Sequence, residues 1–352
     1  MRWLAILATT VTVAVAGCQP QVARDAQPGA RVGVPAQHPA EGADPYGVLI
    51  EAVRSGQPPI QSLAAETFLE SDRLLSREDL LVLAQAPDVR VRTMGLALGG
   101  ASRQREFLEV ARRAVRDPQE VVRVSAAFAM AMCGDASQVT ALRDGLLSPD
   151  VTVRRTSVWL LGLMGNASGV GLLRVKLSDP DAVVVLRAAE AMGRLGSSDG
   201  LERVRAMTEH PRHPIRVFAV RLLGRLGETG DIPRLERLYQ SRFLDVRFAA
   251  VASLARLGDW KRISLLVEFL DSEEAELRLV AARELAETGY RPALERLGKH
   301  LGAADPMERA TIAAAMVRIQ SAGETWRSRI LADERPPSLD ADRPAVIPRT
   351  TP

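Results

Sequence analysis

Hydrophobic residues recur at helical spacing over most of the chain, in blocks that begin and end with the same kinds of residue. In one block, Asp179 and Pro180 precede apolar residues three and four positions apart, and Gly196 closes the run. Aspartate suits the N-cap of a helix, proline its first turn, and glycine the left-handed residue that ends it. A shorter apolar run, for example residues 201–208, follows before the next block. The pattern therefore predicts a unit of two antiparallel helices, a short A helix and a longer B helix.

The unit repeats with a period of 31 residues, which three residue types share. The glycines are Gly134, Gly165, Gly196, Gly227, Gly258 and Gly289. The arginines are Arg123, Arg154, Arg216, Arg247, Arg278 and Arg309, and the one missing member is Val185. The prolines are Pro118, Pro149, Pro180 and Pro211. Because chance would not align three residue types on one period, the chain is predicted to be a repeat array.

Each B helix places large apolar residues beside small ones. Four positions before the terminal glycine lies a leucine or methionine, as at Leu161 and Met192, and three before it lies a glycine or alanine, as at Gly162. One unit cannot bury such a face alone, but stacked neighbours can. We therefore predict an all-α, right-handed α-solenoid of about eight two-helix repeats over residues 45–332. A degenerate helical cap is expected from about Pro45 and a closing helix near residues 325–331.

The repeat resembles the HEAT-repeat family, in its short form known as PBS-lyase HEAT-like. The residues that carry the resemblance are Asp-Val-Arg-Phe-Ala-Ala at 245–250 with Leu-Ala-Arg-Leu-Gly at 254–258, and Val-Arg at 122–123 with Ala-Ala at 126–127. It covers about residues 77–320 and implies a superhelical fold, not a reaction. Ankyrin and tetratricopeptide signatures are absent from the sequence.

The periodic arginine admits two interpretations. It could form a basic ladder that grips phosphates, or it could hold the turns between units together. We favour the structural role, and we expect the weakest junction where Val185 replaces the arginine. The pairs expected from the sequence are Arg90 with Asp88, Arg154 with Asp150, Arg247 with Asp245, and Arg278 with Glu276.

The first 18 residues resemble the leader of a bacterial lipoprotein. Arg2 precedes a short apolar run, and Val-Ala-Gly at 15–17 leads to Cys18. The run is too short for a comfortable membrane span. The resemblance implies a diacylglycerol on Cys18 and cleavage before it, and Gln19 favours the outer membrane over the inner one. An ordinary signal peptide with a chance cysteine, or a cytoplasmic protein with an apolar start, are the alternatives.

Two further segments lie outside the predicted solenoid. Residues 19–44 are rich in Pro, Gly, Ala and Gln without apolar periodicity, and residues 333–352 are rich in proline. We expect the first to be a disordered tether and the second a disordered tail. With the leader, they would make the protein a lipid-anchored, periplasm-facing component of the bacterial cell envelope.

The residues that usually carry catalysis are scarce in this chain. With 46 Lys+Arg against 43 Asp+Glu, the net charge of +3 is too balanced for a dedicated nucleic-acid binder. Two cysteines exclude a disulfide framework, and four histidines leave little for a metal site. HEAT-like hydroxylases hold iron through repeated His-Glu motifs, which the sequence lacks. We therefore predict a protein without catalytic residues, metal or cofactor, and with Cys133 as a core residue.

The variable positions of the B helices are the remaining candidates for function. Residues thirteen, nine, six and two before each terminal glycine share one side of the helix. In HEAT-like solenoids, B helices line the concave surface. The candidate groove combines an apolar end with a basic stretch: Phe128, Met132, Trp159, Leu163, Arg187, Arg194, Arg221, Arg225 and Arg256.

This groove favours a non-catalytic scaffold that binds a protein or peptide, for example a helix or a partly acidic segment. Three alternatives stay open. The large side chains could simply be buried by the cap helices or the tether. The protein could be a lyase or hydroxylase built on the same repeats, or an envelope spacer without a specific ligand. The sequence does not identify the partner.

Overall fold

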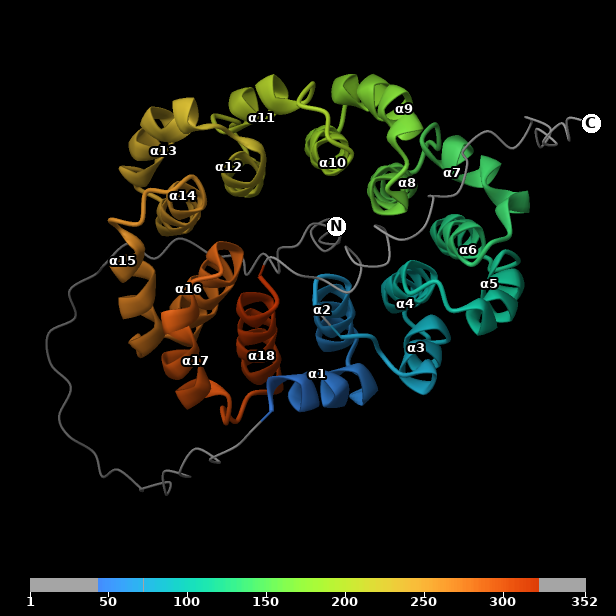
Figure 1. The fold of residues 1–352 in the computed structure, drawn as a ribbon, viewed down its shortest axis with the longest axis horizontal. Coiled ribbons are helices and arrows are strands. Elements are labelled where there is room, and N and C mark those ends of the chain that lie inside the picture. The colour runs from blue at the N-terminus through green and yellow to red at the C-terminus, as the bar shows by residue number, and fades with distance from the viewer. Residues whose placement is uncertain (1–43, 72, 323–352) are drawn as a thin grey trace, which may run out of the picture.

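The computed structural model describes residues 44–71 and 73–322, which form an all-α solenoid without strands. The predicted leader, the tail, the closing helix near 325–331 and all of the tether except Asp44 lie outside these residues. Within them, eighteen α-helices pair into nine two-helix units (Figure 1). The fold class predicted from the 31-residue period is confirmed.

The A and B helices alternate along the chain. The A helices are α1 (Pro45–Arg54), α3 (Arg77–Ala84), α5 (Leu108–Ala114), α7 (Thr140–Gly145), α9 (Val170–Val175), α11 (Leu201–Met207), α13 (Ile232–Tyr239), α15 (Ile263–Glu268) and α17 (Leu294–His300). The B helices are α2 (Pro58–Leu69), α4 (Val89–Ala101), α6 (Glu120–Met132), α8 (Val151–Met164), α10 (Ala182–Arg194), α12 (His213–Leu226), α14 (Leu244–Arg256), α16 (Ala275–Thr288) and α18 (Pro306–Gln320). Short 3-10 turns are η1 (Arg105–Phe107), η2 (Ala136–Gln138), η3 (Ala167–Gly169), η4 (Lys176–Ser178), η5 (Thr229–Asp231), η6 (Phe269–Asp271) and η7 (Arg291–Ala293).

Aspartate side chains start several B helices, although not always the expected aspartate. Asp150 caps α8 by accepting a hydrogen bond from the Thr152 N–H. Helix α10 is capped by Asp181, which accepts from the Val183 and Val184 amides, and not by Asp179 as predicted. Asp179 instead accepts the Asp181 N–H and takes part in an ion pair described below.

Most of the periodic glycines end their B helices in the left-handed conformation. Gly165 and Gly289 follow α8 and α16 with φ of 73° and 68°, where a side chain would be strained. Gly227 differs, because its φ is −73°. Arg103 stands one period before Gly134 and adopts φ of 53°, so the geometric repeat extends one unit beyond the glycine pattern.

The small residues of the B helices allow the close packing that the sequence predicts. A Cβ added at Gly162 would lie 2.7 Å from Ala191 Cβ of the next B helix, and one at Gly100 would lie 2.5 Å from Ala129 Cα. The large residue beside each small one is buried, as Leu161 shows. Neighbouring B helices therefore meet almost backbone to backbone and together form the core.

The array closes on itself into a ring, which the sequence did not predict. Helix α18 packs against α1 and α2 as well as against α16 (Figure 1). The predicted N-terminal cap is therefore covered by the last described unit. Polar contacts cross the closure, since Arg318 pairs with Glu70 at 3.1 Å and Tyr46 Oη lies 3.3 Å from Ser321 Oγ.

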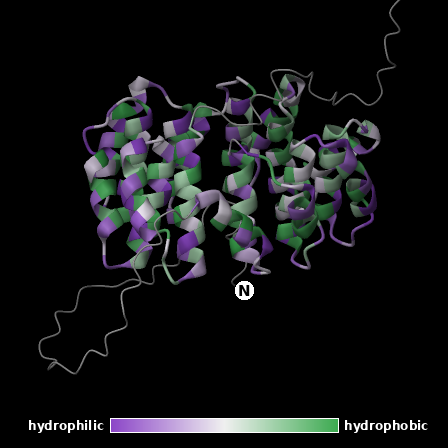
Figure 2. Cartoon of the chain, turned by 60° about the horizontal axis from the view of Figure 1, so that its bottom comes forward, coloured by the Kyte–Doolittle hydropathy of each residue, from purple (hydrophilic) through white to green (hydrophobic). Residues whose placement is uncertain are grey.

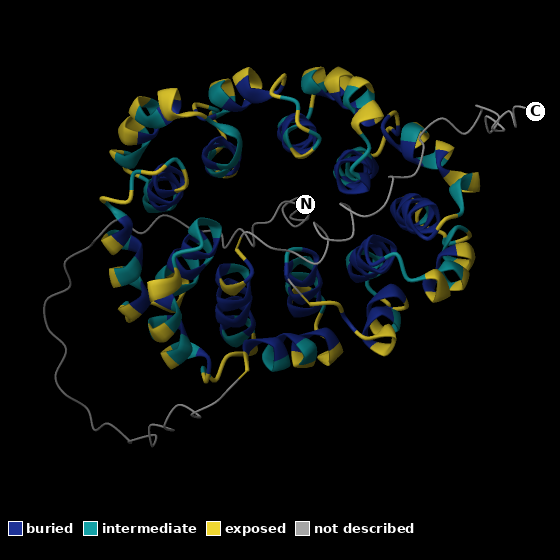
Figure 3. Ribbon diagram, in the orientation of Figure 1, coloured by how far each residue is buried: buried dark blue, intermediate teal, exposed yellow. Residues whose placement is uncertain are grey.

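The two kinds of helix occupy different layers of the ring. The B helices form the inner layer and are largely buried, whereas the A helices form the outer layer and carry most of the exposed residues (Figure 3). Hydrophilic residues are interspersed along the helices (Figure 2). In the described part of the chain, no helix is long and apolar enough to cross a membrane.

Candidate functional site on the inner wall

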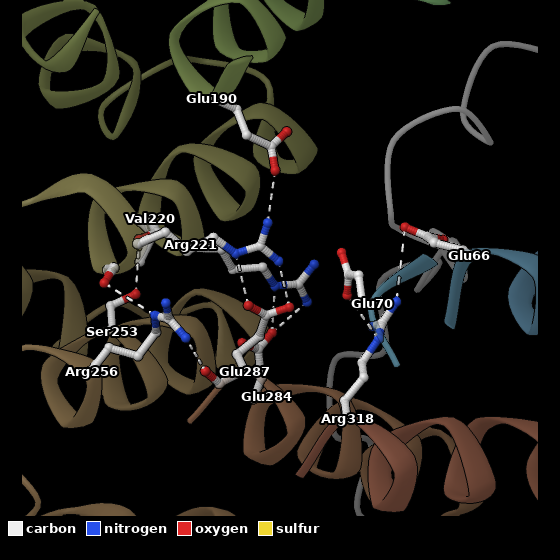
Figure 4. A network of polar contacts seen from close by, with 12 residues as sticks. Glu66, Glu70, Glu190, Val220, Arg221, Ser253, Arg256, Glu284, Glu287 and Arg318 are labelled. Carbon is white, nitrogen blue, oxygen red and sulfur yellow. Dashed lines mark hydrogen bonds and ion pairs between the residues drawn. The ribbon is translucent and has the colours of Figure 1, made fainter. Parts of the chain in front are cut away.

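Charged side chains gather on the inner wall of the ring, on B helices from α10 through α18 to α2. We call this group the inner-wall network (Figure 4). Its members are Glu66, Glu70, Arg187, Glu190, Arg194, Arg221, Arg225, Arg256, Arg283, Glu284, Glu287 and Arg318. Seven arginines therefore face five glutamates, and the network carries a positive excess.

Two arginines of α12 bridge over α14 to reach α16. Arg221 donates to Glu284, with Nε 2.7 Å from Oε1, and Arg225 donates to both carboxylate oxygens of Glu287 at 2.6 and 2.9 Å. The bridge is possible because α14 presents Ser253 between them, whose hydroxyl donates to the Val220 carbonyl at 2.8 Å (Figure 4). These ion pairs thus link α12 to α16, two units further along the chain.

Glu190 is the buried centre of the α10 end of the network. It accepts hydrogen bonds from Arg187 at 2.8 Å, Arg194 at 3.2 Å and Arg225 at 2.8 Å. Burial by itself would raise the pKa of Glu190, but the three arginines outweigh it and lower the pKa to about 2. The carboxylate is therefore charged throughout the physiological range.

The other glutamates divide according to how well they are paired. Burial opposes ionisation of Glu287, yet Arg225 lowers its pKa to about 2. In contrast, burial outweighs the effect of Arg221 and raises the pKa of Glu284, and it likewise raises the pKa of Glu66 despite Arg318. Glu66 and Glu284 therefore protonate more easily than Glu190 and Glu287.

A cleft of about 270 Å³ opens on the inner wall where α12, α14, α16, α18 and α2 approach one another. We call it the inner cleft. Its charged lining residues are Glu70, Arg225, Arg256, Glu287 and Arg318. Arg256 donates to the carbonyls of Gly224 and Glu287, and makes no ion pair with a carboxylate of the described residues. Arg256 is exposed on this wall, so its guanidinium is accessible to an added anion.

The predicted apolar end of the groove is packed into the wall. Phe128, Met132 and Leu163 are buried, with at most 6 % of each residue exposed, and Trp159 is partly buried against the core. They are covered because B helices approach closely at small residues; the Phe128 ring, for example, lies against Gly100. Among these four, only Trp159 offers appreciable surface to a partner, and the binding role of all four stays a prediction.

The predicted basic stretch does lie together, but its arginines are engaged with partners inside the protein. Arg187, Arg194, Arg221 and Arg225 all bind glutamates of the network. The helical spacing places Glu190 and Glu287 on the same face as these arginines, but the pairing was not predicted. A signal was present, because Arg225 and Glu287 are 62 residues apart, which is two repeat periods.

The periodic arginine holds the A–B turns on one rim of the ring. Arg154 donates through Nη1 to the carbonyls of Ser148 at 2.9 Å and Pro149 at 3.2 Å, and Arg123 and Arg216 make the same pair of bonds in their own turns. We call residues in this position rim arginines. The other edge of Arg154 reaches the next unit, since its Nε lies 3.0 Å from Asp179.

The expected carboxylate partners of these arginines are only partly correct. Arg90 does pair with Asp88, at 3.2 Å. Arg154 pairs with Asp179 and not Asp150, because Asp150 caps its own helix. The partner of Arg278 is Glu308 of the next unit and not Glu276, and Arg247 lies over the Tyr239 ring and not beside Asp245.

A second set of arginines links the outer A helices. Arg112 pairs with Asp135, Arg174 with Asp199, and Arg205 with Asp231, each acid lying at the start of the next unit. Arg112, Arg174 and Arg205 share the repeat period, so self-comparison of the A helices would have found them. These three junctions are thus linked by ion pairs on the outer side of the ring.

Among the described residues, no three His, Cys, Asp or Glu side chains come together as metal ligands. Cys133 is buried, and burial raises the pKa of its thiol to about 11. At neutral pH this thiol is therefore protonated and is a poor nucleophile.

A family model for HEAT repeats matches residues 142–217 and 205–278. Residues 142–278 therefore match the HEAT-repeat model. These matches cover α8 to α15, the segment that includes Arg221 and Arg225 of the inner-wall network.

Solved structures similar to the chain include HEAT-like proteins. The complex of CpcE and CpcF of phycocyanin lyase from a Nostoc species matches with 19 % identity and a TM-score of 0.39, over 69 % of this chain and 94 % of that one. Human deoxyhypusine hydroxylase matches with 16 % identity and a TM-score of 0.31, over 78 % and 98 %. Similarity at this level carries no argument about activity. No curated protein matches the sequence significantly.

Proposed function

We propose that this protein is a non-catalytic interaction scaffold that binds an acidic segment of a partner protein at the inner cleft. Arg256 carries the proposal, because it is exposed, lines the inner cleft and makes no ion pair with a carboxylate of the described residues. Arg225 and Arg318 line the same cleft and add positive charge. A partner carboxylate would bind Arg256 without breaking an existing ion pair, which makes recognition by a preformed surface feasible.

The proposal includes a location at the bacterial envelope. The apolar leader and the Val-Ala-Gly-Cys sequence at 15–18 support a lipid on Cys18 and a periplasm-facing solenoid, at the outer rather than the inner membrane. Two or more acyl chains suffice for stable anchoring. A tether of the length of residues 19–44 would keep the partner-binding ring near the membrane and raise the local concentration of both proteins.

Site-specific photocrosslinking in intact cells tests the binding site. A photoreactive residue at Thr288, which lines the inner cleft, should crosslink a partner, and one at Arg203, exposed on the outer helix α11, should not. Mass spectrometry of the crosslinked peptide should identify an acidic segment. Adding Arg256→Gln should reduce the crosslink while helicity stays unchanged. An equal yield from both positions, or a yield indifferent to Arg256→Gln, would refute the proposal.

Fractionation tests the anchor separately. The full chain should incorporate a radioactive fatty acid and sediment with membranes, whereas Cys18→Ala should do neither and should appear in the soluble fraction. Incorporation of label into Cys18→Ala would contradict the assignment of Cys18, whatever the outcome of the crosslinking.

A further inference from the structure

A second and larger cleft lies on the rim, between the turn that joins α11 to α12 and the turn that joins α13 to α14. Its volume is about 530 Å³. We call it the rim cleft. Its principal lining residues are His213, Arg216, Arg237, Arg242 and Phe243. None of these belongs to the inner-wall network, so the rim cleft is separate from the proposed inner site.

The rim arginine of this junction lacks the carboxylate that the rim arginines Arg92 and Arg154 have, as does Arg123. Arg92 pairs with Asp117 at 3.1 Å and Arg154 pairs with Asp179 at 3.0 Å, and each acid lies 25 residues after its arginine. The residue 25 positions after Arg216 is Ser241. Arg216 therefore makes no ion pair with a described carboxylate.

Serine fits this turn as aspartate does, but without the charge. The Ser241 hydroxyl accepts the Phe243 N–H at 3.2 Å, just as Asp179 accepts the amide two residues later at 3.1 Å. The turn is therefore formed in the same way at both junctions. The carboxylate is therefore missing beside Arg216 from a turn of the same form.

Around Arg216, the rim cleft is positive and has an aromatic floor. The guanidinium carbons of Arg216 and Arg242 lie 5.0 and 4.8 Å from the centre of the Phe243 ring. Arg237 and Arg242 are exposed and make no ion pair with the described residues. The lining carboxylate, Glu209, pairs with Arg234 at 3.3 Å.

Asp245, which lies beyond the lining residues, is close to His213, with 2.8 Å between Oδ1 and Nε2. Neither nearby acid is therefore positioned to neutralise the three arginines of the rim cleft. An arginine fork held in place by carbonyl bonds, with its other edge unpaired, is preorganised for a carboxylate.

We propose that the rim cleft binds an acidic segment of a partner protein, with one carboxylate taking the place beside Arg216 that Asp117 and Asp179 occupy at other junctions. Arg237 and Arg242 would bind flanking acidic residues, and Phe243 would pack against the aliphatic part of an incoming side chain. The protein's own junctions show that this edge of a rim arginine binds carboxylates. The proposal goes beyond the inner cleft and does not depend on it.

The substitution Ser241→Asp tests this directly, because it supplies the missing carboxylate from within. The probe is a fluorescent peptide of alternating Glu and Ala residues, measured by anisotropy against the full chain at low salt. Ser241→Asp should weaken binding by about tenfold or more, the equivalent of one charge-assisted contact. It should also raise the melting temperature. Arg242→Glu should weaken binding similarly, while the alternating Gln and Ala peptide should not bind.

Two controls make the outcome specific. Ser272→Asp changes the same repeat position at the next junction and should leave peptide binding unchanged. Arg256→Gln alters the inner cleft and should also leave it unchanged, so failure of the rim site and failure of the inner site are distinguishable. Full binding by Ser241→Asp would overturn the proposal. So would loss of binding in Arg256→Gln, displacement by inorganic phosphate at matched ionic strength, or self-association of the chain that Arg242→Glu abolishes.

Discussion

The rim arginines offer a direct measurement of how neighbouring units are held together. Arg154 and Arg123 occupy the same repeat position and donate to the same two carbonyls of their turns. Only Arg154 also forms an ion pair with the next unit, through Asp179. Comparing Arg154→Ala with Arg123→Ala therefore isolates the contribution of the inter-unit ion pair.

The geometry sets the size of the expected difference. The side chain of Asp179 is only 3 % exposed, so Arg154→Ala leaves a buried carboxylate without its main partner. Removing one partner of a buried pair costs about 3–5 kcal/mol. Asp179 retains the Asp181 amide at 3.1 Å and Lys176 Nζ at 3.7 Å, which places the cost near the lower limit. We therefore expect about 3 kcal/mol for Arg154→Ala, against about 1 kcal/mol for Arg123→Ala, which loses carbonyl bonds only.

Urea unfolding followed by circular dichroism at 222 nm measures both free energies, and amide hydrogen exchange locates the change. In Arg154→Ala, protection should fall in α8 and α10, on the two sides of the altered junction, and helix content should be unchanged. If Arg123→Ala proved as costly as Arg154→Ala, the carbonyl bonds would account for the whole effect, and the assignment of an inter-unit role to the ion pair would be wrong.

Three further predictions concern the ring. Arg318→Met should increase hydrogen exchange in α1, α2 and α18, because it removes the ion pairs that cross the closure; unchanged exchange there would mean that apolar packing alone closes the ring. The pKa of Glu287 is lowered from 4.5 to about 2, so the ionised carboxylate stabilises the fold above pH 4.5 and this contribution is lost as the pH falls toward 2. In Glu287→Gln, the free energy of unfolding in urea should therefore fall less steeply with acid than in the unchanged protein. Gly162→Ala should lower the free energy of unfolding by about 1–3 kcal/mol, since the added Cβ would lie 2.7 Å from Ala191 Cβ. In the same urea titration the control Gly171→Ala should be neutral or stabilising, because its Cβ would meet nothing within 4 Å.

The repeat period predicted the features that each unit determines by itself. The left-handed glycines and the close approach at Gly162 follow from residues inside one unit or in adjacent units. The left-handed conformation of Arg103 was not predicted, because this position of the repeat is not occupied by glycine there. The repeat period did not predict ring closure either. The contact between Tyr46 and Ser321 joins residues 275 positions apart, and it depends on the summed curvature of all nine units.

The candidate site was predicted in position and missed in pairing. The helical spacing placed Arg221, Arg225 and Arg256 on the inner face, where the structure has them. Arg221 and Arg225 pair with acids of α16, two units away, and the pattern of a single helix holds no information about a helix that far along the chain. The depth of the apolar residues was missed for a related reason. Whether Phe128 faces solvent or a neighbouring helix depends on how closely that helix approaches.

The inner-wall network lies where the apolar core is interrupted. One hydrophobic cluster contains Leu186 of α10 with the buried face of α12 and part of α14, and a larger cluster, to which Met192 of α10 belongs, comprises most of the remaining core. The arginines of α12 bind Glu190 on α10 and Glu284 on α16, so ion pairs extend from the small cluster to the helices on both sides. The same segment contains Val185, where the rim arginine is absent. At α10 and α12 the two apolar clusters are separate and no rim arginine is present at position 185. The ion pairs of Arg221 and Arg225 therefore add a link between these units and their neighbours.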